Sequence, residues 1–96
     1  MAVTYDPEKN ARNVALRGLP FDLVGALDWD GAVALPDERR QYGEERVKVL
    51  ATLEGALHVA IVTIRGDDMR VISFRKANRT ERRLYEKYVE TQSRGV

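Results

Sequence analysis

A run of basic residues near the end of the chain has the composition of a phosphate-binding surface. The stretch from residue 70 to residue 83 carries one acid, Glu81, and six basic side chains: Arg70, Arg75, Lys76, Arg79, Arg82 and Arg83. Phosphodiester oxygens accept charge-assisted hydrogen bonds from such groups. A solvated helix face, with arginines paired to glutamates at helical spacing, would have the same composition. The stretch is therefore a solvated surface, a nucleic-acid-binding surface or a catalytic edge.

The length and composition of the chain predict a single domain whose chemistry does not involve cysteine thiolates. A chain of 96 residues has room for a single core, so we expect residues 1–96 to form one domain. The net charge is +1, so the basic run is a local feature of a nearly neutral protein. There is no cysteine, and the one histidine, His58, cannot form a multi-histidine metal site within the chain. No apolar run has the roughly 20 residues of a membrane span, and we expect a cytoplasmic protein that does not bind a membrane.

Three alternating segments predict an antiparallel meander. They cover residues 46–53, 57–65 and 69–76, and the middle segment is apolar enough to be buried on both faces. We therefore expect 57–65 to be the central strand. Residues 2–5 form a short strand at the start, and 32–35 have the composition of another.

Helix signals precede and follow the meander. Asp6 is the predicted N-cap of a helix over about 7–17, which Gly18 ends. The apolar side of that helix consists of Ala11, Val14 and Ala15. Phe21, Val24 and Leu27 are spaced as in a second short helix.

The closing helix is predicted over about 78–91. Asn78 caps it, and Glu81 occupies the capping-box position three residues later. Its apolar stripe consists of Leu84, Tyr85, Tyr88 and Val89. The whole pattern is an α+β fold with the helices on one face of the sheet.

The turn between the second and third segments determines which side chains share a face. A loop over residues 66–69 would pair Arg65 with Arg70. The pairs that follow are Thr63 with Ile72, Val62 with Ser73, and Ile61 with Phe74. In this register Ile61 and Phe74 lie on the apolar, helix-covered face, with Val59 and Ile72.

The first turn allows two registers. A two-residue loop, Glu54-Gly55, would place Arg46 and Lys48 on the apolar face. A three-residue loop over 54–56 would place Val47, Val49 and Ala51 there instead. Burying two unpaired cations would cost several kcal/mol, so we choose the three-residue loop.

The chosen register gathers polar side chains on the open face of the sheet, and these are Arg46, Lys48, His58, Ser73 and Arg75. Cations, an imidazole and a hydroxyl on one face suit a phosphodiester. Each has a simpler interpretation, because a lone strand histidine is usually just half-buried and edge lysines prevent edge pairing. Tyr85 and Tyr88 are more often core residues.

Four segments together resemble the BrnT toxin family: YDPEKNARN, GLPFDLVGAL, DERRQYGEERVKVL and RVISFRKANRTERRLYE. The resemblance runs over about residues 5–86. It implies a RelE-like fold and a ribonuclease that cuts RNA and stops translation, without a cofactor. The implied partner is a BrnA-like antitoxin with a ribbon-helix-helix part, and operator DNA would be bound only through that antitoxin.

Metal-independent RNA cleavage needs a base, cations at the phosphate and an acid. We expect Arg46 and Arg75 to stabilise the phosphate, and Glu45 or His58 to be the base, although the chosen register sets Glu45 on the face opposite Arg46. The acid is His58, Lys48 or Tyr85, because an arginine does not readily release a proton. Ser73 completes the catalytic set. RNA-backbone contacts are assigned to Arg65, Arg70, Lys76, Arg79 and Arg82.

The chain departs from the family at the end of the first helix. Family members commonly have Lys-His-Gly there, and this chain has Leu16, Arg17 and Gly18. The alternative function is therefore a catalytically weakened homologue that acts as an antitoxin-binding co-repressor module.

Overall fold

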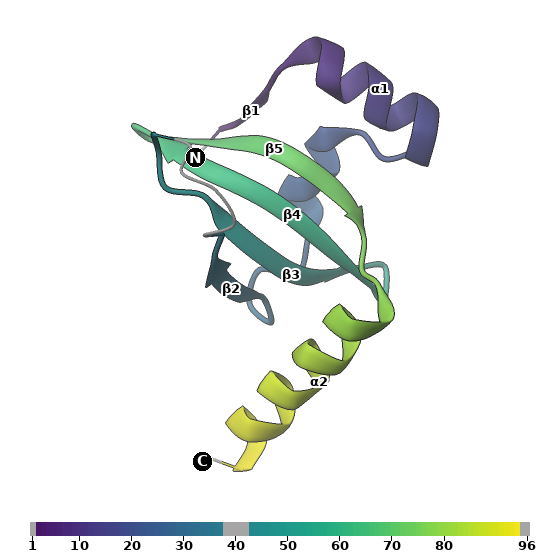
Figure 1. The fold of residues 1–96 in the computed structure, drawn as a ribbon, viewed down its shortest axis with the longest axis vertical. Coiled ribbons are helices and arrows are strands. Elements are labelled where there is room, and N and C mark those ends of the chain that lie inside the picture. Colours follow the sequence, from purple (N-terminus) through teal and green to yellow (C-terminus); the bar gives the residue numbers. More distant parts are fainter. Residues whose placement is uncertain (1, 38–42, 95–96) are drawn as a thin grey trace.

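The computed structural model describes residues 2–37 and 43–94, which form an α+β fold around one mixed sheet (Figure 1). The strand order is β1-β5-β4-β3-β2. The strands are β1 (Val3–Tyr5), β2 (Val33–Pro36), β3 (Val47–Leu53), β4 (Ala56–Arg65) and β5 (Asp68–Lys76). The helices are α1 (Pro7–Arg17), the 3-10 helix η1 (Phe21–Ala26) and α2 (Arg79–Arg94).

The predicted antiparallel meander is confirmed as strands β3, β4 and β5. β4 is central, and its middle residues are buried without interruption, as an apolar strand covered on both faces requires. β2 extends the meander antiparallel to β3, and β1 adds to the other edge parallel to β5. The predicted second helix is one 3-10 segment, η1.

The first turn is a two-residue turn, so the predicted three-residue loop is wrong. Leu53 pairs with Ala56 across Glu54 and Gly55, whose φ values are +50° and +82°. A type I′ turn requires positive φ at both central residues, and its twist matches that of the strands. This register sets Lys48 beside Ile61, yet Lys48 is not unpaired, because Glu81 lies 2.8 Å from its ammonium. The free-energy cost of burying an unpaired lysine, which argued against this turn, therefore does not arise.

The second turn is also shorter than predicted. Arg65 pairs with Asp68 rather than Arg70, and the turn consists of Gly66 and Asp67. A β-bulge then shifts the register between Ile61 and Val62. The predicted pairs are wrong, and the pairs in the structure are Thr63 with Arg70, Val62 with Val71, Ile61 with Ser73, and Ala60 with Phe74.

Two apolar clusters lie on opposite faces of the sheet, so the prediction of helices on one face is wrong. One face carries the larger cluster, in which Ala60 and Val62 pack with Phe21 and Val24 from η1 and with Phe74. The opposite face carries Leu50 and Val59, which pack with Ala77 and, from α2, Tyr85. Side chains alternate along β4, and each face therefore has its own helical cover.

Helix α1 has the predicted ends and an unexpected orientation. Asp6 caps it through a 2.9 Å bond from the amide of Glu8, and Gly18 ends it at φ +68°. The predicted apolar side, Ala11, Val14 and Ala15, is exposed, and Asn13 is the buried residue of the helix. α1 is therefore attached to the protein through polar groups.

Helix α2 contacts the body through its first turns and then extends away from it (Figure 1). The predicted capping box is confirmed, because Asn78 Oδ1 accepts from the amide of Glu81 at 2.8 Å and the Asn78 amide donates to Glu81 at 2.9 Å. Tyr85 is half-buried, but Tyr88 is 40% exposed, so its predicted core position is wrong.

Candidate functional site

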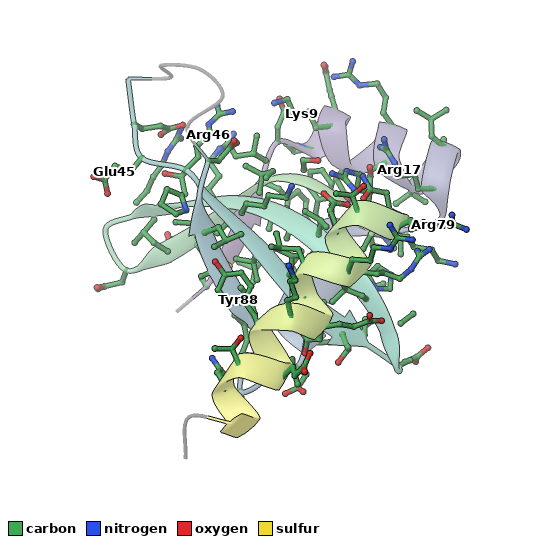
Figure 2. All side chains as sticks on the ribbon, turned by 60° about the horizontal axis from the view of Figure 1, so that its bottom comes forward. Lys9, Arg17, Glu45, Arg46, Arg79 and Tyr88 are labelled. Carbon is green, nitrogen blue, oxygen red and sulfur yellow. The ribbon has the colours of Figure 1, made fainter. Side chains whose placement is uncertain are left out.

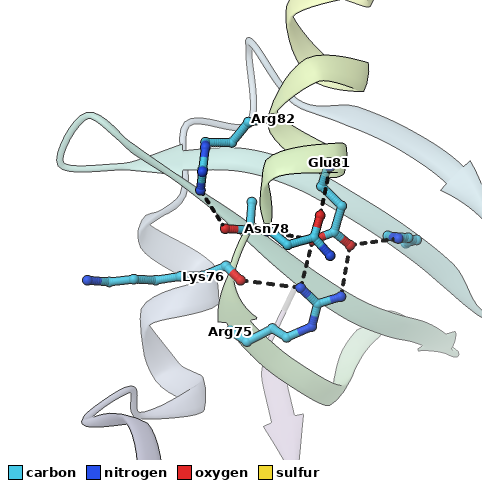
Figure 3. Close-up of polar contacts among 7 residues, drawn as sticks. Arg75, Lys76, Asn78, Glu81 and Arg82 are labelled. Atoms are coloured by element: carbon cyan, nitrogen blue, oxygen red, sulfur yellow. Dashed lines mark hydrogen bonds and ion pairs between the residues drawn. The ribbon is translucent and has the colours of Figure 1, made fainter.

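A buried carboxylate joins two of the predicted site residues. Glu81 is 5% exposed and accepts two bonds from the Arg75 guanidinium, at 2.7 and 2.8 Å (Figure 3). The ammonium of Lys48 approaches the same carboxylate to 2.8 Å. A bidentate arginine–carboxylate pair is among the strongest charge-assisted contacts in proteins. The cluster of Lys48, Arg75 and Glu81 thus ties α2 to β3 and β5.

The electrostatics of this cluster favour the ionised carboxylate. The hydrogen bonds from Arg75 are the largest cause that lowers the pKa of Glu81, and burial acts in the opposite direction. The amide of Asn78 and the ammonium of Lys48 lower the pKa further, so that it lies far below the usual range of a glutamate. Glu81 therefore stays ionised at neutral pH and offsets part of the charge of its two cations.

The predicted shared face for His58, Ser73 and Arg75 is wrong. Ser73 and Lys48 flank Ile61 in one cross-strand row, and Arg75 lies opposite Val59 on that same face. His58 lies on the other face and packs its ring against Phe74, with centroids 5.4 Å apart. The β-bulge between Ile61 and Val62 causes this separation, because a one-residue shift moves side chains to the opposite face, whereas the shorter second turn shifts the pairing by two residues and leaves the faces unchanged.

His58 is in a buried position that keeps it from solvent. The side chain is 3% exposed, and Nδ1 lies 2.8 Å from the carbonyl oxygen of Ala56. If Nδ1 carries the proton, this contact fixes the tautomer and leaves Nε2 as an acceptor. A phosphodiester cannot reach this imidazole in the conformation described.

Glu45 and Arg46 lie at the other end of the sheet. Figure 2 shows them on one side of the molecule, with Arg17 and Arg79 on the other. Arg46 and Arg65 approach the carboxylate of Glu44 to 3.6 and 3.1 Å. Glu45 is exposed, and its backbone carbonyl accepts from the hydroxyl of Thr63 at 2.7 Å. These residues form a second charged group centred on Glu44, separate from that of Glu81.

Tyr85 lies one helical turn after Glu81 on α2 and packs on the same face of the sheet as Val59. Its hydroxyl donates to the carbonyl of Gly31 at 3.1 Å, so the ring holds α2 against the segment before β2. The phenol is therefore the one predicted proton carrier, besides Lys48, on the face that carries Arg75.

The remaining basic residues differ in whether a carboxylate neutralises them. Arg82 donates to the carbonyl of Ala77 at 2.9 Å. Lys76 and Arg79 are exposed, and neither has a carboxylate partner within the part of the chain that the structure describes. Arg70 is half-buried in β5, opposite Thr4 of β1. Among the residues assigned to RNA-backbone contacts, the two that are exposed and have no polar side-chain partner in the described chain, Lys76 and Arg79, thus lie at the end of β5 and the start of α2.

Reasoning from the sequence missed three polar residues. Asn10 and Asn13 fix α1 to the segment that follows it, and Glu44 neutralises two arginines. Spacing gave no signal for Glu44, since its partners depend on the register of β4. The three-residue spacing of the two asparagines on one side of α1 was a signal that could have been used.

Within residues 2–37 and 43–94, no group of three or more histidine, aspartate or glutamate side chains is placed to hold a metal ion. The helices described there include none long and apolar enough to cross a membrane.

Comparison with known proteins identifies the family. The family model described as "Ribonuclease toxin, BrnT, of type II toxin-antitoxin system" matches residues 5–81, which is most of the chain. No curated protein matches the sequence. The matched region runs from the last residue of β1, Tyr5, through α1, η1 and strands β2 to β5 to Glu81 in the first turn of α2. The chain therefore belongs to the BrnT family of ribonuclease toxins of type II toxin–antitoxin systems.

Proposed function

We propose that this ribonuclease toxin binds the RNA backbone at the end of β5 and the start of α2. The observation that carries the proposal is the exposure of Lys76 and Arg79 without a carboxylate partner in the described chain. Such cations gain most from phosphate oxygens, because no internal ion pair has to be broken first. Arg82 follows Arg79 on α2 and adds to the positive potential of this surface, whereas Arg70 lies near the other end of β5 and is proposed to contact RNA away from it.

Cleavage is proposed to occur on the sheet face that carries Arg75. The 2′-hydroxyl would attack the adjacent phosphorus, and the 5′-oxygen would leave with a proton. Lys48 and Arg75 have side-chain exposures of 28% and 32%, so both are accessible to a phosphate. Tyr85 and Lys48 are the proposed proton carriers here, because His58 is buried on the opposite face. Arg46, Glu45 and Arg65 lie at the other end of the sheet and are proposed to contact RNA outside the cleaved bond.

The reaction is proposed to be metal-independent. The proposal is based on Lys48 and Arg75, two cations on one sheet face that could stabilise the charge of a phosphorane without a metal. RNA cleavage of this kind would stop translation in the cytoplasm. The strand–helix order, with a sheet closed by a C-terminal helix, supports a RelE-like fold.

A second candidate function is an antitoxin-binding co-repressor with weakened catalysis. The observation that favours it is that Glu81 pairs with Lys48 and Arg75 and offsets part of their charge, and that His58 is buried. A protein of this kind would bind its antitoxin and would not cut RNA.

The proposed partner is a BrnA-like antitoxin that binds operator DNA through a ribbon-helix-helix part. An acidic antitoxin segment would complement the surface around Lys76 and Arg79 and would compete with RNA there. Co-expression with that antitoxin should yield a stable complex. Purification of the chain alone from such cells would contradict this.

The experiment that tests the proposed function measures RNA cleavage by purified protein, with and without ribosomes. The double variant Lys76→Ala/Arg79→Ala should bind RNA roughly tenfold more weakly, as expected for two exposed ionic contacts. The matched control is Arg83→Ala/Lys87→Ala, which removes the same charge from another part of α2. Equal losses in the two double variants would contradict a defined site. Antitoxin binding without cleavage under either condition would favour the co-repressor.

A further inference from the structure

A buried asparagine in α1 has all of its polar atoms engaged. Asn13 is 5% exposed, and its Nδ2 donates to the carbonyl of Leu19 at 2.8 Å and to that of Phe74 at 3.0 Å. Two carbonyls can be satisfied only by the amide nitrogen, so the orientation of the amide is determined. Its oxygen, Oδ1, is consequently a fixed acceptor that faces the C-terminal turn of α1.

Arg17 uses that acceptor. Its Nη1 donates to Oδ1 of Asn13 at 2.7 Å, from four residues further along the same side of the helix. Arg17 is exposed, and this is its one polar contact within the described chain. A guanidinium carries five N–H donors, so most of them remain available at the surface. One end of the guanidinium is held, and the other end is accessible to a ligand.

The position of Arg17 relates it to the basic surface already described. The bond from Asn13 to the carbonyl of Phe74 joins α1 to β5, two residues before Lys76. Figure 2 shows Arg17 and Arg79 on the same side of the molecule. Arg17, Lys76 and Arg79 all lack a carboxylate partner among the described residues. They contrast with Arg75 and Lys48, which Glu81 neutralises.

We propose that Arg17 is a phosphate-binding residue of the RNA site and that Asn13 is the residue that positions it. The inference rests on the proposed function and adds α1 to the RNA-binding surface. A planar guanidinium offers paired donors that match two phosphate oxygens, which a lysine ammonium does not. Because Asn13 already restricts the side chain, less rotational freedom is lost when a phosphate binds.

The test is the salt dependence of RNA binding. A fluorescent single-stranded oligoribonucleotide with 2′-O-methyl groups resists cleavage, so its affinity can be measured at several salt concentrations. Each phosphate contact contributes about 0.7 to the slope of log affinity against log salt for a single strand. Arg17→Ala should reduce the slope by about that amount and weaken binding about threefold to tenfold, with circular dichroism to confirm that the variant is folded. Arg17→Lys should keep the slope and lose part of the affinity.

The matched control is Arg12→Ala, which removes the same charge from α1. Arg12 is exposed and makes no polar contact within the described residues, so its loss should leave the slope unchanged. Asn13→Ala, if folded by circular dichroism, should weaken binding in the wild-type background and have little further effect in Arg17→Ala.

Three results would overturn the inference. They are an Arg17→Ala protein that binds as wild type at every salt concentration, an equal loss in Arg12→Ala, and a lowered melting temperature with an unchanged slope. The last would mean that Arg17 only supports Asn13. A wild-type protein that binds no RNA would instead overturn the proposed function, and this inference with it.

Discussion

At the scale of single residues, Glu81 determines which basic groups are available to a ligand. It accepts bonds from Arg75 and Lys48 and also completes the cap of α2. One carboxylate therefore combines two tasks, local capping and the pairing of two distant strands. Removal of the Glu81 carboxylate should therefore lower the stability of the fold more than it lowers RNA cleavage.

Glu81→Gln should lower the free energy of unfolding by about 2–4 kcal/mol, because two partly buried cations lose their counter-charge. Urea denaturation followed by circular dichroism measures this directly. Glu86→Gln is the matched control, since Glu86 is exposed on the same helix and has no ion pair within the described residues. Similar midpoints for the two variants would show that the Glu81 cluster contributes little.

The stability of the protein should depend on pH through the ionisation of Glu81. The folded state lowers the pKa of Glu81 below its ordinary value of 4.5. A group of this kind stabilises the protein above its unfolded-state pKa, and that contribution is lost as the pH falls towards its folded-state pKa. The stability difference between wild type and Glu81→Gln should therefore be full at pH 7 and shrink from about pH 5 to about pH 2. A difference independent of pH would exclude Glu81 as the titrating group.

Arg75→Ala is expected to lower the stability of the fold and also the rate of the proposed RNA cleavage. Loss of the bidentate partner leaves Glu81 buried with Lys48 alone, which should cost about 2–3 kcal/mol. Arg83→Ala, on the exposed side of α2, should stay within about 0.5 kcal/mol of wild type and retain its toxicity. Growth arrest on induction, read together with thermal melts, separates a folding defect from a catalytic one. A fully stable, non-toxic Arg75→Ala would assign this arginine to the reaction alone.

At the scale of elements, most of the secondary structure could be predicted, because its signals are local. Asp6, Gly18 and Asn78 mark helix ends through their own backbone and side-chain chemistry, and all three are at those positions. The register could not be predicted from them. A glutamate at positive φ and a bulge beside Val62 each shift the pairing by one residue, and neither has a distinctive sequence.

The turn between β3 and β4 offers a direct test of the observed register. Glu54 has φ +50°, a conformation that asparagine tolerates far better than glutamate. Glu54→Asn would create an Asn-Gly type I′ turn and should stabilise the protein by about 0.5–1 kcal/mol. Chemical denaturation provides the measurement, with Glu45→Asn, at an exposed position outside the helices and strands, as a control for the change of charge. Destabilisation would mean that Glu54 is not at the first centre of a two-residue turn.

The candidate site was harder to predict from the sequence than the helices and strands, because it too depends on contacts between distant segments. Its residue types were visible in the basic run, but whether a cation is free depends on contacts between distant segments. Lys48 and Arg75 were expected to be without internal partners, and Glu81 pairs with both and offsets part of their charge. Arg17, in contrast, has no carboxylate partner in the described chain. It is positioned by Asn13, which donates to the carbonyl of Phe74, 61 residues later in the sequence.

At the scale of the whole molecule, the sheet separates two cores that are unequal in size and connected through β4. Amide hydrogen exchange should therefore be slowest in β4, which is paired on both edges and covered on both faces. Exchange should be fastest in α2 beyond Tyr88, where the stripe residues are exposed. Mass spectrometry of exchanged peptides tests the order. Protection of the end of α2 equal to that of β4 in the isolated protein would contradict it.

Helix α1 has a further consequence for how the sequence can change over generations. Its contacts are directional hydrogen bonds, which Asn13 donates and Asn10 accepts, and its apolar side chains face water. In a library of random variants selected for folding, Ala11, Val14 and Ala15 should accept polar replacements almost freely. Asn13 should reject even aspartate, which cannot donate to the two carbonyls, and Asn10 should accept only residues that can still accept from the amide of Phe21. For this helix, the usual rule that apolar positions are constrained and polar ones drift would be reversed.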